Sequence, residues 1–420
     1  MERPGVLIVT EHASARFGGE AALALHYFRV LRRRGVPVWL ITHERTRAEL
    51  LQAFPGEARM VFVRDTWFHK LMWRIGRRLP DQISAFSTGF AQRLSAQLQQ
   101  RRLVRQLLAR EAIGVIHQPM PVSPKEPSML YGFGVPVIIG PMNGGMEYPP
   151  GLSFQRGMVE RWFFQFGRWS SALLNWLMPG KRQAAVLLVA NERTRASLPR
   201  GSCRDVRLLV ENGVDLSLWS TAVAAVPAPQ GLPTFVFMGR LVGWKAVDLL
   251  LQAFQRANGR HPMRLLIVGD GTERKRLERL AGTLGVLAAT QDAAGVRFTG
   301  WLPQQDCAEV LRNADGLVLP SLYECGGAVV LEAMSMGKPV IATAWGGPVD
   351  YLDEQCGVLV PPASRESLVQ GFEDAMVDLA SSPDKRARMG AAGRRKVREE
   401  YDWEVKVERM IGIYREVSAA

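Results

Sequence analysis

Short apolar runs alternate with amphipathic runs along most of the chain. In the first half, the apolar runs lie at residues 5–10, 36–42, 114–118, 135–140 and 185–190. In the second half, they lie at residues 233–239, 263–269, 295–300, 314–320 and 337–343. Runs of helical periodicity separate them, such as 20–34, which stops at Gly35. The pattern predicts buried strands joined by helices.

Strands that alternate with helices are typical of parallel sheets covered by helices on both faces. The chain has 420 residues, which suits two domains of about 200 residues each. The join is expected near residues 211–215 and the Pro/Ala-rich segment 224–233. We therefore predict two Rossmann-like, doubly wound α/β domains, residues 1–212 and 213–399, that face each other across a substrate cleft.

Composition places the chain among ordinary soluble proteins, with 47% hydrophobic and 22% charged residues. The four cysteines have no metal-like spacing, and the N-terminus lacks a signal-peptide pattern. No apolar run reaches the roughly 20 residues that span a bilayer. We therefore expect a cytoplasmic protein that does not cross a membrane.

The net charge of +13 lies entirely in the first half of the chain. Residues 1–215 hold 30 Lys and Arg against 16 Asp and Glu. Within them, Trp67–Arg110 holds nine basic residues and one acid, interleaved with aromatic and aliphatic residues around 67–75. This stretch suits peripheral contact with an anionic membrane surface. An ordinary solvated helical face stays open as the alternative. No nucleic-acid partner is expected, because no nucleic-acid-binding motif accompanies the charge.

One segment, 320–342, combines two acids eight residues apart with a glycine pair. The segment is predicted to form a strand, a loop and a helix, and Gly337 is predicted to cap the C-terminus of this helix. The amides of Gly326, Gly327 and Ala328 then lie at a helix N-terminus, which favours an anion such as phosphate. Glu324 and Glu332 could be separated by roughly 12 Å along such a helix. Paired carboxylates in glycosidases lie about 5–9.5 Å apart, so a hydrolytic pair is disfavoured.

Three other glycine or basic loops follow predicted strands. Arg240 and Lys245 follow the strand at 233–239, and Gly18-Gly19 opens the first predicted helix. Gly269 and Gly271 follow another strand, but the dinucleotide fingerprint is incomplete. The chain contains no Asp-x-Asp motif, which argues against a carboxylate-held metal on a nucleotide diphosphate. We predict no metal and no other cofactor.

These residues carry a resemblance to a known family. The segments GRLVGWKAVDLLLQAF, LLIVGDGTERKRLE, VRFTGWLP, ADGLVLPSLYECGGAVVLEAMSMGKPVIATAWGG and GVLVPP resemble the C-terminal domain of the family 4 retaining glycosyltransferases, which have the glycosyltransferase B fold. RFGGE, VIHQP and VPVIIGPMNGG are similar to a bacterial polysaccharide-type subgroup. YDWE at 401–404 matches the point where such proteins return a last helix, here about 400–420, to the first domain.

The resemblance implies a role for each matching residue. The second domain would bind a nucleotide-sugar donor and the first an acceptor. Arg240 and Lys245 would neutralise the donor diphosphate, Glu332 would bind the ribose, and Glu324 would face the transferred sugar beside the Gly326-Gly327-Ala328 amides. The other implied donor-binding residues are Gly18, Gly19, Gly269, Gly271 and Arg297, the last three towards the nucleobase. His117 would line the sugar pocket, with a general-base role left open. Asn143, Gly144 and Gly145 could face the acceptor.

One departure from the family pattern concerns the loop after Glu324. Family members commonly read Glu-Gly-Phe-Gly, whereas this chain reads Glu324-Cys325-Gly326-Gly327. The missing aromatic residue leaves the donor sugar open. For the mechanism, a carboxylate nucleophile is one route to retention. Front-face attack by the acceptor, with the leaving phosphate oxygen taking its proton, fits the family better.

The sequence thus predicts a metal-independent, retaining glycosyltransferase of hexosyltransferase type. A UDP-sugar donor is favoured over a GDP-sugar, with a glycan or lipid-linked glycan as acceptor in bacterial surface polysaccharide biosynthesis. Peripheral attachment at the inner face of the cell membrane is expected from the basic first half. Two alternatives stay open: an inert nucleotide-sugar-binding scaffold, and an epimerase or phosphorylase on the same fold.

Overall fold

A computed structural model describes residues 5–78, 85–152, 171–220 and 231–419. The chain divides into two compact units. The first unit comprises residues 1–145, 156–211 and 406–420, and the second comprises residues 146–155 and 212–405. The sequence-based domains placed the join at 212–213 and the returning helix at about 400–420. The short segment 146–155, which belongs to the second unit, was not anticipated.

The first unit is built on a parallel sheet with the strand order β3-β2-β1-β4-β5-β6-β7 in its described residues. The strands are β1 (Gly5–Val9), β2 (Val38–His43), β3 (Met60–Val63), β4 (Ile113–Gln118), β5 (Val137–Met142), β6 (Val186–Val189) and β7 (Val206–Leu208). The helices of this unit are α1 (Gly19–Arg33), α2 (Arg47–Ala53), α3 (Trp67–Gly76), α5 (Phe90–Leu108), α7 (Gly180–Gln183), α8 (Glu192–Ala196) and most of α16 (Trp403–Ala419).

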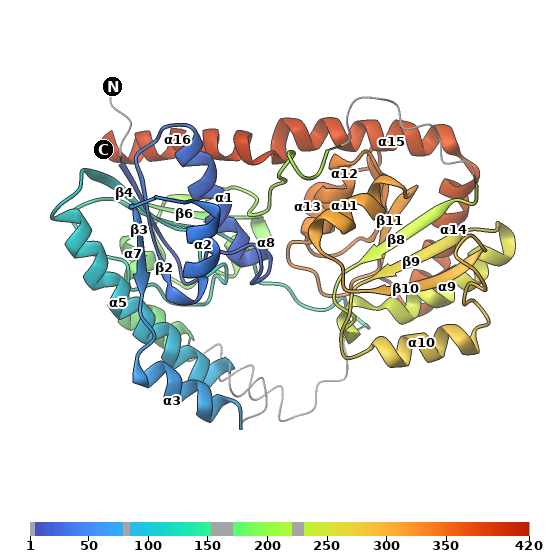
Figure 1. Cartoon of the computed structure of the whole chain (residues 1–420), viewed down its shortest axis with the longest axis horizontal. Helices are drawn as coiled ribbons and strands as arrows, with labels where there is room; N and C mark the ends of the chain where they lie inside the picture. Colours follow the sequence, from blue (N-terminus) through green and yellow to red (C-terminus); the bar gives the residue numbers. More distant parts are fainter. Residues whose placement is uncertain (1–4, 79–84, 153–170, 221–230, 420) are drawn as a thin grey trace. The chain divides into compact units, whose positions relative to one another are not determined.

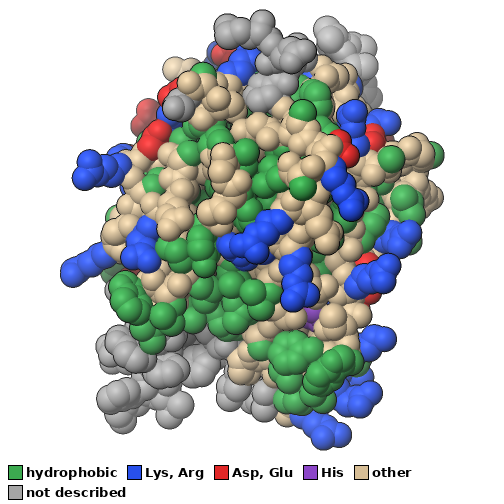
Figure 2. Space-filling view, turned by 90° about the vertical axis from the view of Figure 1, so that its left-hand side faces the viewer, with side chains coloured by type: hydrophobic (Ala, Val, Ile, Leu, Met, Phe, Trp, Pro, Cys, Tyr) green, Lys and Arg blue, Asp and Glu red, His purple; other side chains and the backbone are tan. Residues whose placement is uncertain are grey.

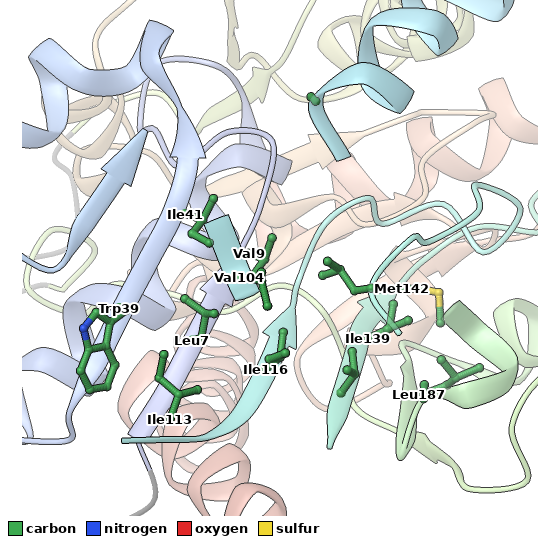
Figure 3. Packing of buried hydrophobic residues seen from close by; sticks show 14 of the residues in the cluster. Leu7, Val9, Trp39, Ile41, Val104, Ile113, Ile116, Ile139, Met142 and Leu187 are labelled. Carbon is green, nitrogen blue, oxygen red and sulfur yellow. The ribbon is translucent and has the colours of Figure 1, made fainter. Parts of the chain in front are cut away.

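Both faces of this sheet are buried, as near-continuous apolar strands require. All residues of β1, β2, β5 and β6 are buried. Figure 3 shows the core on one face of the sheet, where Leu7 and Val9 of β1 lie near Ile116 of β4 and Val104 of α5. The α16 helix is held to the unit by ion pairs of Glu408 with Arg34 and of Glu416 with Arg207.

The second unit holds a parallel sheet with the order β10-β9-β8-β11-β12-β13 in its described residues. The strands are β8 (Thr234–Met238), β9 (Arg264–Val268), β10 (Gly295–Gly300), β11 (Gly316–Leu319), β12 (Val340–Thr343) and β13 (Gly357–Val360). The helices are α9 (Val247–Arg260), α10 (Arg274–Thr283), α11 (Gln304–Arg312), α12 (Ala328–Ser335), α13 (Pro348–Tyr351), α14 (Arg365–Ser381) and α15 (Pro383–Lys396). Figure 1 shows α9 and α14 side by side, and they pack on each other.

The expected fold class is confirmed, because each unit is a doubly wound parallel sheet covered by helices. In each sheet the strand order reverses beside the first strand, between β1 and β4 in one and between β8 and β11 in the other. Ligands of open α/β sheets bind in the crevice outside the carboxyl ends of the strands at such a switch point. Each unit therefore has one place where a ligand is expected.

None of the helices in the described part of the chain combines the length and the apolar character needed to cross a bilayer.

Candidate functional site

The switch point of the second unit brings two loops together. The loop after β8 carries Arg240 and Lys245, and the loop after β11 carries Glu324. The amide of Leu322 donates a hydrogen bond to the carbonyl oxygen of Trp244 at 2.9 Å, which ties the two loops to each other. Residues that are about 80 positions apart in the sequence are thus placed at one edge of the sheet, as the sequence predicted.

An ion pair joins Lys245 to Glu324. The Lys245 ammonium donates to a carboxylate oxygen of Glu324, and each side chain is only 14% exposed. Arg240 is exposed and lies over the Trp244 ring, with its guanidinium carbon 6.0 Å from the ring centroid. The site therefore presents one paired and one solvent-facing cation beside the carboxyl ends of β8 and β11.

The N-terminus of α12 follows directly after this carboxylate. Gly327 is its N-cap residue and adopts φ 73°, a left-handed conformation that favours glycine. The amide of Gly347 donates to the Glu324 carbonyl at 2.7 Å, and a Cβ at Gly347 would lie 2.1 Å from the Gly326 carbonyl oxygen. Close backbone packing thus fixes the loop. The N-terminus of α12, which begins at Ala328, is an end of the helix that favours an anion.

Glu332 lies on the second turn of α12 and is largely buried. Burial raises the pKa of its carboxyl group to about 7. Among the described residues, no ion pair or hydrogen bond to this carboxylate is present. A carboxylate in this setting has its acceptor oxygens available, and hydroxyl donors would stabilise its ionised form.

Gly269 and Gly271 have a packing role next to the same site. A Cβ at Gly269 would lie 1.9 Å from the carbonyl oxygen of Gly239, and one at Gly271 would lie 2.3 Å from that of Leu241. Leu241 also donates to the Asp270 carbonyl at 2.9 Å. The two glycines therefore allow the loop after β9 to contact the loop that carries Arg240. Their contact with a nucleobase stays a prediction.

Arg297 does not lie where the nucleobase prediction needs it. It is the third residue of β10, not part of a loop, and β10 is an edge strand rather than a strand of the switch point. Its side chain lines a cavity with Thr234 and Arg264, the first residues of β8 and β9. That cavity is at the amino ends of the strands, opposite to Lys245 and Glu324. The structure therefore lends no support to the predicted role of Arg297 in donor binding.

The first unit has a cavity of about 330 Å³ at its own switch point. Gly18 and Gly19 at the start of α1 line it, together with Met120 and Pro121 after β4. Gly18 has φ 95°, and a Cβ on either glycine would meet open space. The glycine pair thus adds no side chain to this edge of the cavity. The contact of this loop with a diphosphate stays a prediction.

Sequence reasoning missed four polar residues of this cavity: Glu11, His12, Arg93 and Glu126. Burial raises the pKa values of Glu11 and Glu126, and the nearby guanidinium of Arg93 opposes this rise. Arg93 donates to Glu126 at 2.6 Å. Burial, with a smaller effect of the Arg45 charge, lowers the pKa of His12 and favours its neutral ring. These four residues belong to no recognisable sequence motif, so the sequence offered no signal that would have identified them.

His117 is a structural residue of the first unit. It is fully buried on β4, and Nε2 lies 2.7 Å from the Gly140 carbonyl oxygen while Nδ1 lies 2.7 Å from the hydroxyl of Tyr414. Both ring nitrogens are therefore engaged within the protein. Burial lowers the pKa of His117 to about 4. The geometry does not support the predicted contact with a sugar or a general-base role.

Asn143, Gly144 and Gly145 are also used inside the first unit. The Asn143 amide donates to Glu211 at 2.6 Å, and both side chains are buried. A Cβ at Gly144 would lie 2.6 Å from Pro124, and one at Gly145 would lie 2.7 Å from the Ser197 side chain. Internal packing accounts for these three residues, so the structure lends no support to the predicted acceptor contact.

A hydrophobic and basic surface, defined here by Trp67–Arg78, covers part of the first unit. The exposed hydrophobic side chains on it are Trp67 (75% exposed), Leu71, Trp73 (54%) and Ile75. Its cations include Lys70, Arg74, Arg77 and Arg78. Figure 2 shows that hydrophobic side chains gather among Lys and Arg on one face, with few acids. The predicted amphipathic basic stretch is thus present on α3.

The family comparison concerns the second unit. Residues 221–396 match the family model described as Glycosyl transferases group 1. This match covers less than half of the chain, but it includes Arg240, Lys245, Glu324 and Glu332.

Curated relatives match the chain over part of their length. The GDP-mannose-dependent monoacylated alpha-(1-6)-phosphatidylinositol monomannoside mannosyltransferase of Corynebacterium glutamicum is 33% identical over 189 residues, which are 43% of this chain and 46% of the relative. A further relative is covered to 50%. The chain thus spans about half the length of the curated relatives it matches.

Solved structures match over both units. Sucrose-phosphate synthase from Thermosynechococcus elongatus has a TM-score of 0.66 at 20% identity, covering 99% of this chain and 100% of that chain. HepE of Anabaena in complex with UDP-glucose has a TM-score of 0.62 at 16% identity, covering 99% and 100%. At these identities the likeness concerns the fold alone. The fold is that of the glycosyltransferase B structures, as the sequence resemblance implied.

Proposed function

We propose that this protein is a retaining glycosyltransferase that transfers a sugar from a nucleotide-diphosphate donor to a glycan or lipid-linked glycan acceptor. The second unit binds the donor and the first unit binds the acceptor. The proposed place of the reaction is bacterial surface polysaccharide biosynthesis, at the inner face of the cell membrane.

The observation that carries the proposal is the arrangement at the switch point of the second unit. Lys245, Glu324 and the N-terminus of α12 lie together there, with Glu332 one turn further along the helix. These residues fall inside the segment that matches glycosyl transferases group 1. A cation and an anion-favouring helix end suit a diphosphate, and a carboxylate without a partner among the described residues suits the hydroxyl groups of a ribose.

The proposed mechanism relies on electrostatic stabilisation. When the bond between the sugar carbon and the phosphate oxygen breaks, negative charge develops on the diphosphate. Arg240, Lys245 and the α12 amides are placed to stabilise this charge, which is the main means of catalysis in such reactions. The acceptor oxygen bonds to the sugar carbon on the same face, and its proton passes to the leaving phosphate oxygen. We propose that no metal is required.

For the acceptor, we propose the cavity of the first unit around Gly18 and Gly19. His12 lines this cavity, and burial lowers the pKa of its ring, whereas His117 is enclosed. Glu11 and Glu126 offer acceptors for sugar hydroxyls at the same place. We therefore assign to His12 the role of orienting the attacking hydroxyl.

For the donor, a UDP-sugar is favoured over a GDP-sugar. Support comes from the HepE structure, which holds UDP-glucose and has the same fold. The Corynebacterium relative is named as GDP-mannose-dependent, so a GDP-sugar belongs in the test. The loop Cys325-Gly326 lies beside Glu324 and sets the shape of the proposed sugar pocket.

The hydrophobic and basic surface of the first unit is proposed to contact an anionic membrane. Trp67 and Trp73 would insert at the headgroup level while Lys70 and Arg74 contact anionic lipids. A lipid-linked acceptor would then be held near the enzyme.

A donor panel tests the proposal. Purified protein is incubated with UDP- and GDP-sugars, and nucleotide-diphosphate release is measured with and without a divalent-metal chelator. Release from one donor class that survives the chelator is expected. Abolition by the chelator would contradict metal independence, and donor binding without any turnover would favour the scaffold alternative. The anomeric configuration of the product, read by NMR, tests retention.

A further inference from the structure

The second unit contains a cavity of about 390 Å³ that the proposed transfer reaction does not use. It lies at the amino ends of β8 and β9, since Thr234 and Arg264 are the first residues of those strands. The proposed donor residues follow the carboxyl ends of β8 and β11. The cavity is thus separated from the donor site by the length of the strands, and its volume falls in the range of small-ligand pockets.

One wall of the cavity is a face of the sheet. Thr234 pairs with Arg264, and Leu266 pairs with Arg297 on the neighbouring parallel strands. Because side chains alternate between the two faces of a strand, Arg264 and Leu266 point to the same face. Paired residues share that face, so Arg297 lies on it as well. Two guanidinium groups on adjacent strands therefore line one wall.

The two arginines differ in their partners. Arg264 donates to the Thr234 hydroxyl at 2.9 Å and lies 3.5 Å from Asp292, whose side chain is 92% exposed. An ion pair with such an exposed partner is weak and exchanges easily. Arg297 has no hydrogen bond or ion pair in the part of the chain that the structure describes. Its planar guanidinium, with five N–H donors, is available to an anion.

The opposite wall is one face of α11. Asp306, Glu309 and Asn313 lie on it at helical spacing. Glu309 is neutralised by an ion pair with Arg312, whereas Asp306 has no ion pair or hydrogen bond among the described side chains. The cavity therefore presents cations on the sheet side and a carboxylate on the helix side. This lining suits a ligand that has an anionic group at one end and hydroxyl groups at the other.

We propose that this cavity is a second ligand site, which binds a phosphate monoester of a polyhydroxylated compound, such as a sugar phosphate. The phosphate lies against Arg297 and Arg264, and hydroxyl groups donate to Asp306. This site goes beyond the transfer reaction and does not depend on it. A bare phosphate ion binds more weakly, because it lacks the carbon-bound hydroxyl groups that donate to Asp306.

The test is a titration with glucose 6-phosphate, followed by calorimetry and by the shift in melting temperature. We expect saturable binding with a Kd of about 1 mM or tighter, weakened at least about tenfold by Arg297→Gln. Arg297→Lys, which keeps the charge, retains part of the affinity. The matched control Arg276→Gln removes an exposed arginine of α10 that pairs with Glu273 and leaves binding unchanged. Each variant's melting temperature without ligand verifies that it is folded.

Two further measurements distinguish ligand binding at this cavity from binding at the donor site and from non-specific binding of an anion. Lys245→Ala leaves glucose 6-phosphate binding unchanged, since Lys245 lies at the opposite end of the strands. Inorganic phosphate binds at least about tenfold more weakly than glucose 6-phosphate, and Asp306→Asn reduces that difference. The proposal is overturned if glucose 6-phosphate shows no saturable binding, if Arg297→Gln does not weaken it, or if Lys245→Ala abolishes it. Equal affinity for inorganic phosphate would overturn the hydroxyl recognition.

Discussion

Lys245 and Glu324 form an ion pair that joins the loop after β8 to the loop after β11. The pair sits where the strand order of the second sheet reverses. A diphosphate bound at the N-terminus of α12 would share the Lys245 ammonium with this carboxylate. The pair thereby links the positioning of the loop to the charge that the proposed reaction must stabilise.

Lys245→Ala is expected to lower kcat for sugar transfer by about 100-fold or more, because one preorganised cation is lost from the leaving diphosphate. Lys245→Arg keeps the charge and is expected to retain part of the activity. The measurement is steady-state diphosphate release with the donor identified by the panel. Arg276→Gln serves as the control, since it removes an exposed cation of the same unit. Unchanged kcat in Lys245→Ala would contradict the electrostatic mechanism.

Glu332 predicts a pH dependence of donor binding. Its pKa is about 7, so the carboxylate that would accept the ribose hydroxyls becomes protonated as the pH falls below that value. We expect the KM for the donor to rise as the pH is lowered from 8 to 6, by at most about tenfold per pH unit. In Glu332→Gln the KM should be high and nearly constant over this range. If the KM of the wild type does not depend on pH, the proposed binding of the ribose by Glu332 is wrong.

The raised pKa of Glu332 also predicts how the stability of the protein without bound donor changes with pH. The pKa of Glu332 is raised from 4.5 to about 7 in the folded protein. Between these values the folded state binds more protons than the unfolded state, so this contribution to stability is present below pH 4.5 and is lost as the pH rises through 7. Glu332→Gln should therefore stabilise the protein at pH 8, by up to about 3 kcal/mol, and have little effect at pH 4.5. Thermal melts at both pH values measure this.

Much of the fold followed from the sequence, and the errors have a common cause. Ten apolar runs were recognised, nine of them central strands and one the edge strand β10, whereas β3, β7 and β13 were not, and all three are edge strands. An edge strand is covered less completely, so its apolar signal is weak: Val206 and Arg207 of β7 are only partly buried and Leu208 is exposed. Arg240, Lys245, Glu324 and Glu332 could be placed because their loops follow strongly apolar strands.

Burial, which a motif does not report, explains why the structure does not support the predicted role of His117. His117 follows an apolar strand pattern just as a site residue would, but Tyr414 from the end of the chain covers it. His12 has no motif, yet the fold places it in the cavity of Gly18 and Gly19. Long-range packing decides which histidine is available, and a single sequence holds no direct signal of it.

The two histidines predict opposite phenotypes. His12→Gln should reduce transfer to the acceptor by about 10- to 100-fold, with donor affinity and melting temperature nearly unchanged. His117→Gln should lower the melting temperature, because the buried Gly140 carbonyl and Tyr414 hydroxyl lose a well-placed partner. Transfer kinetics and thermal melts on both variants check this. Loss of transfer in a stable His117→Gln, with full activity in His12→Gln, would reverse our assignment.

Gly269 predicts a large effect of one methyl group on stability. Gly269→Ala places a Cβ 1.9 Å from the Gly239 carbonyl oxygen, at a residue with φ 137°. The loops after β8 and β9 would have to separate, and we expect a loss of more than about 2 kcal/mol in the free energy of unfolding. Gly259→Ala, in α9 with open space around it, is the control and should be neutral or stabilising by up to about 1 kcal/mol. Equal stability of the two variants would mean that the loops are not in contact.

The hydrophobic and basic surface predicts membrane binding that depends on both its aromatic and its charged side chains. Wild-type protein should sediment with vesicles that contain anionic lipid at low salt and should be released as the salt concentration rises. Trp67→Ser combined with Trp73→Ser should reduce the bound fraction, because the exposed indole rings that enter the interface are removed. Vesicle sedimentation at several salt concentrations measures both effects.

A matched control for these variants exists in the second unit. Trp301 is 72% exposed and lies outside the hydrophobic and basic surface, so Trp301→Ser should bind vesicles as the wild type does. Loss of binding in Trp301→Ser would point to a general effect of exposed tryptophan rather than to this surface. If the wild type fails to sediment with anionic vesicles at low salt, the proposed peripheral attachment is wrong. The proposed transfer reaction is unaffected, because it is measured by nucleotide-diphosphate release without vesicles.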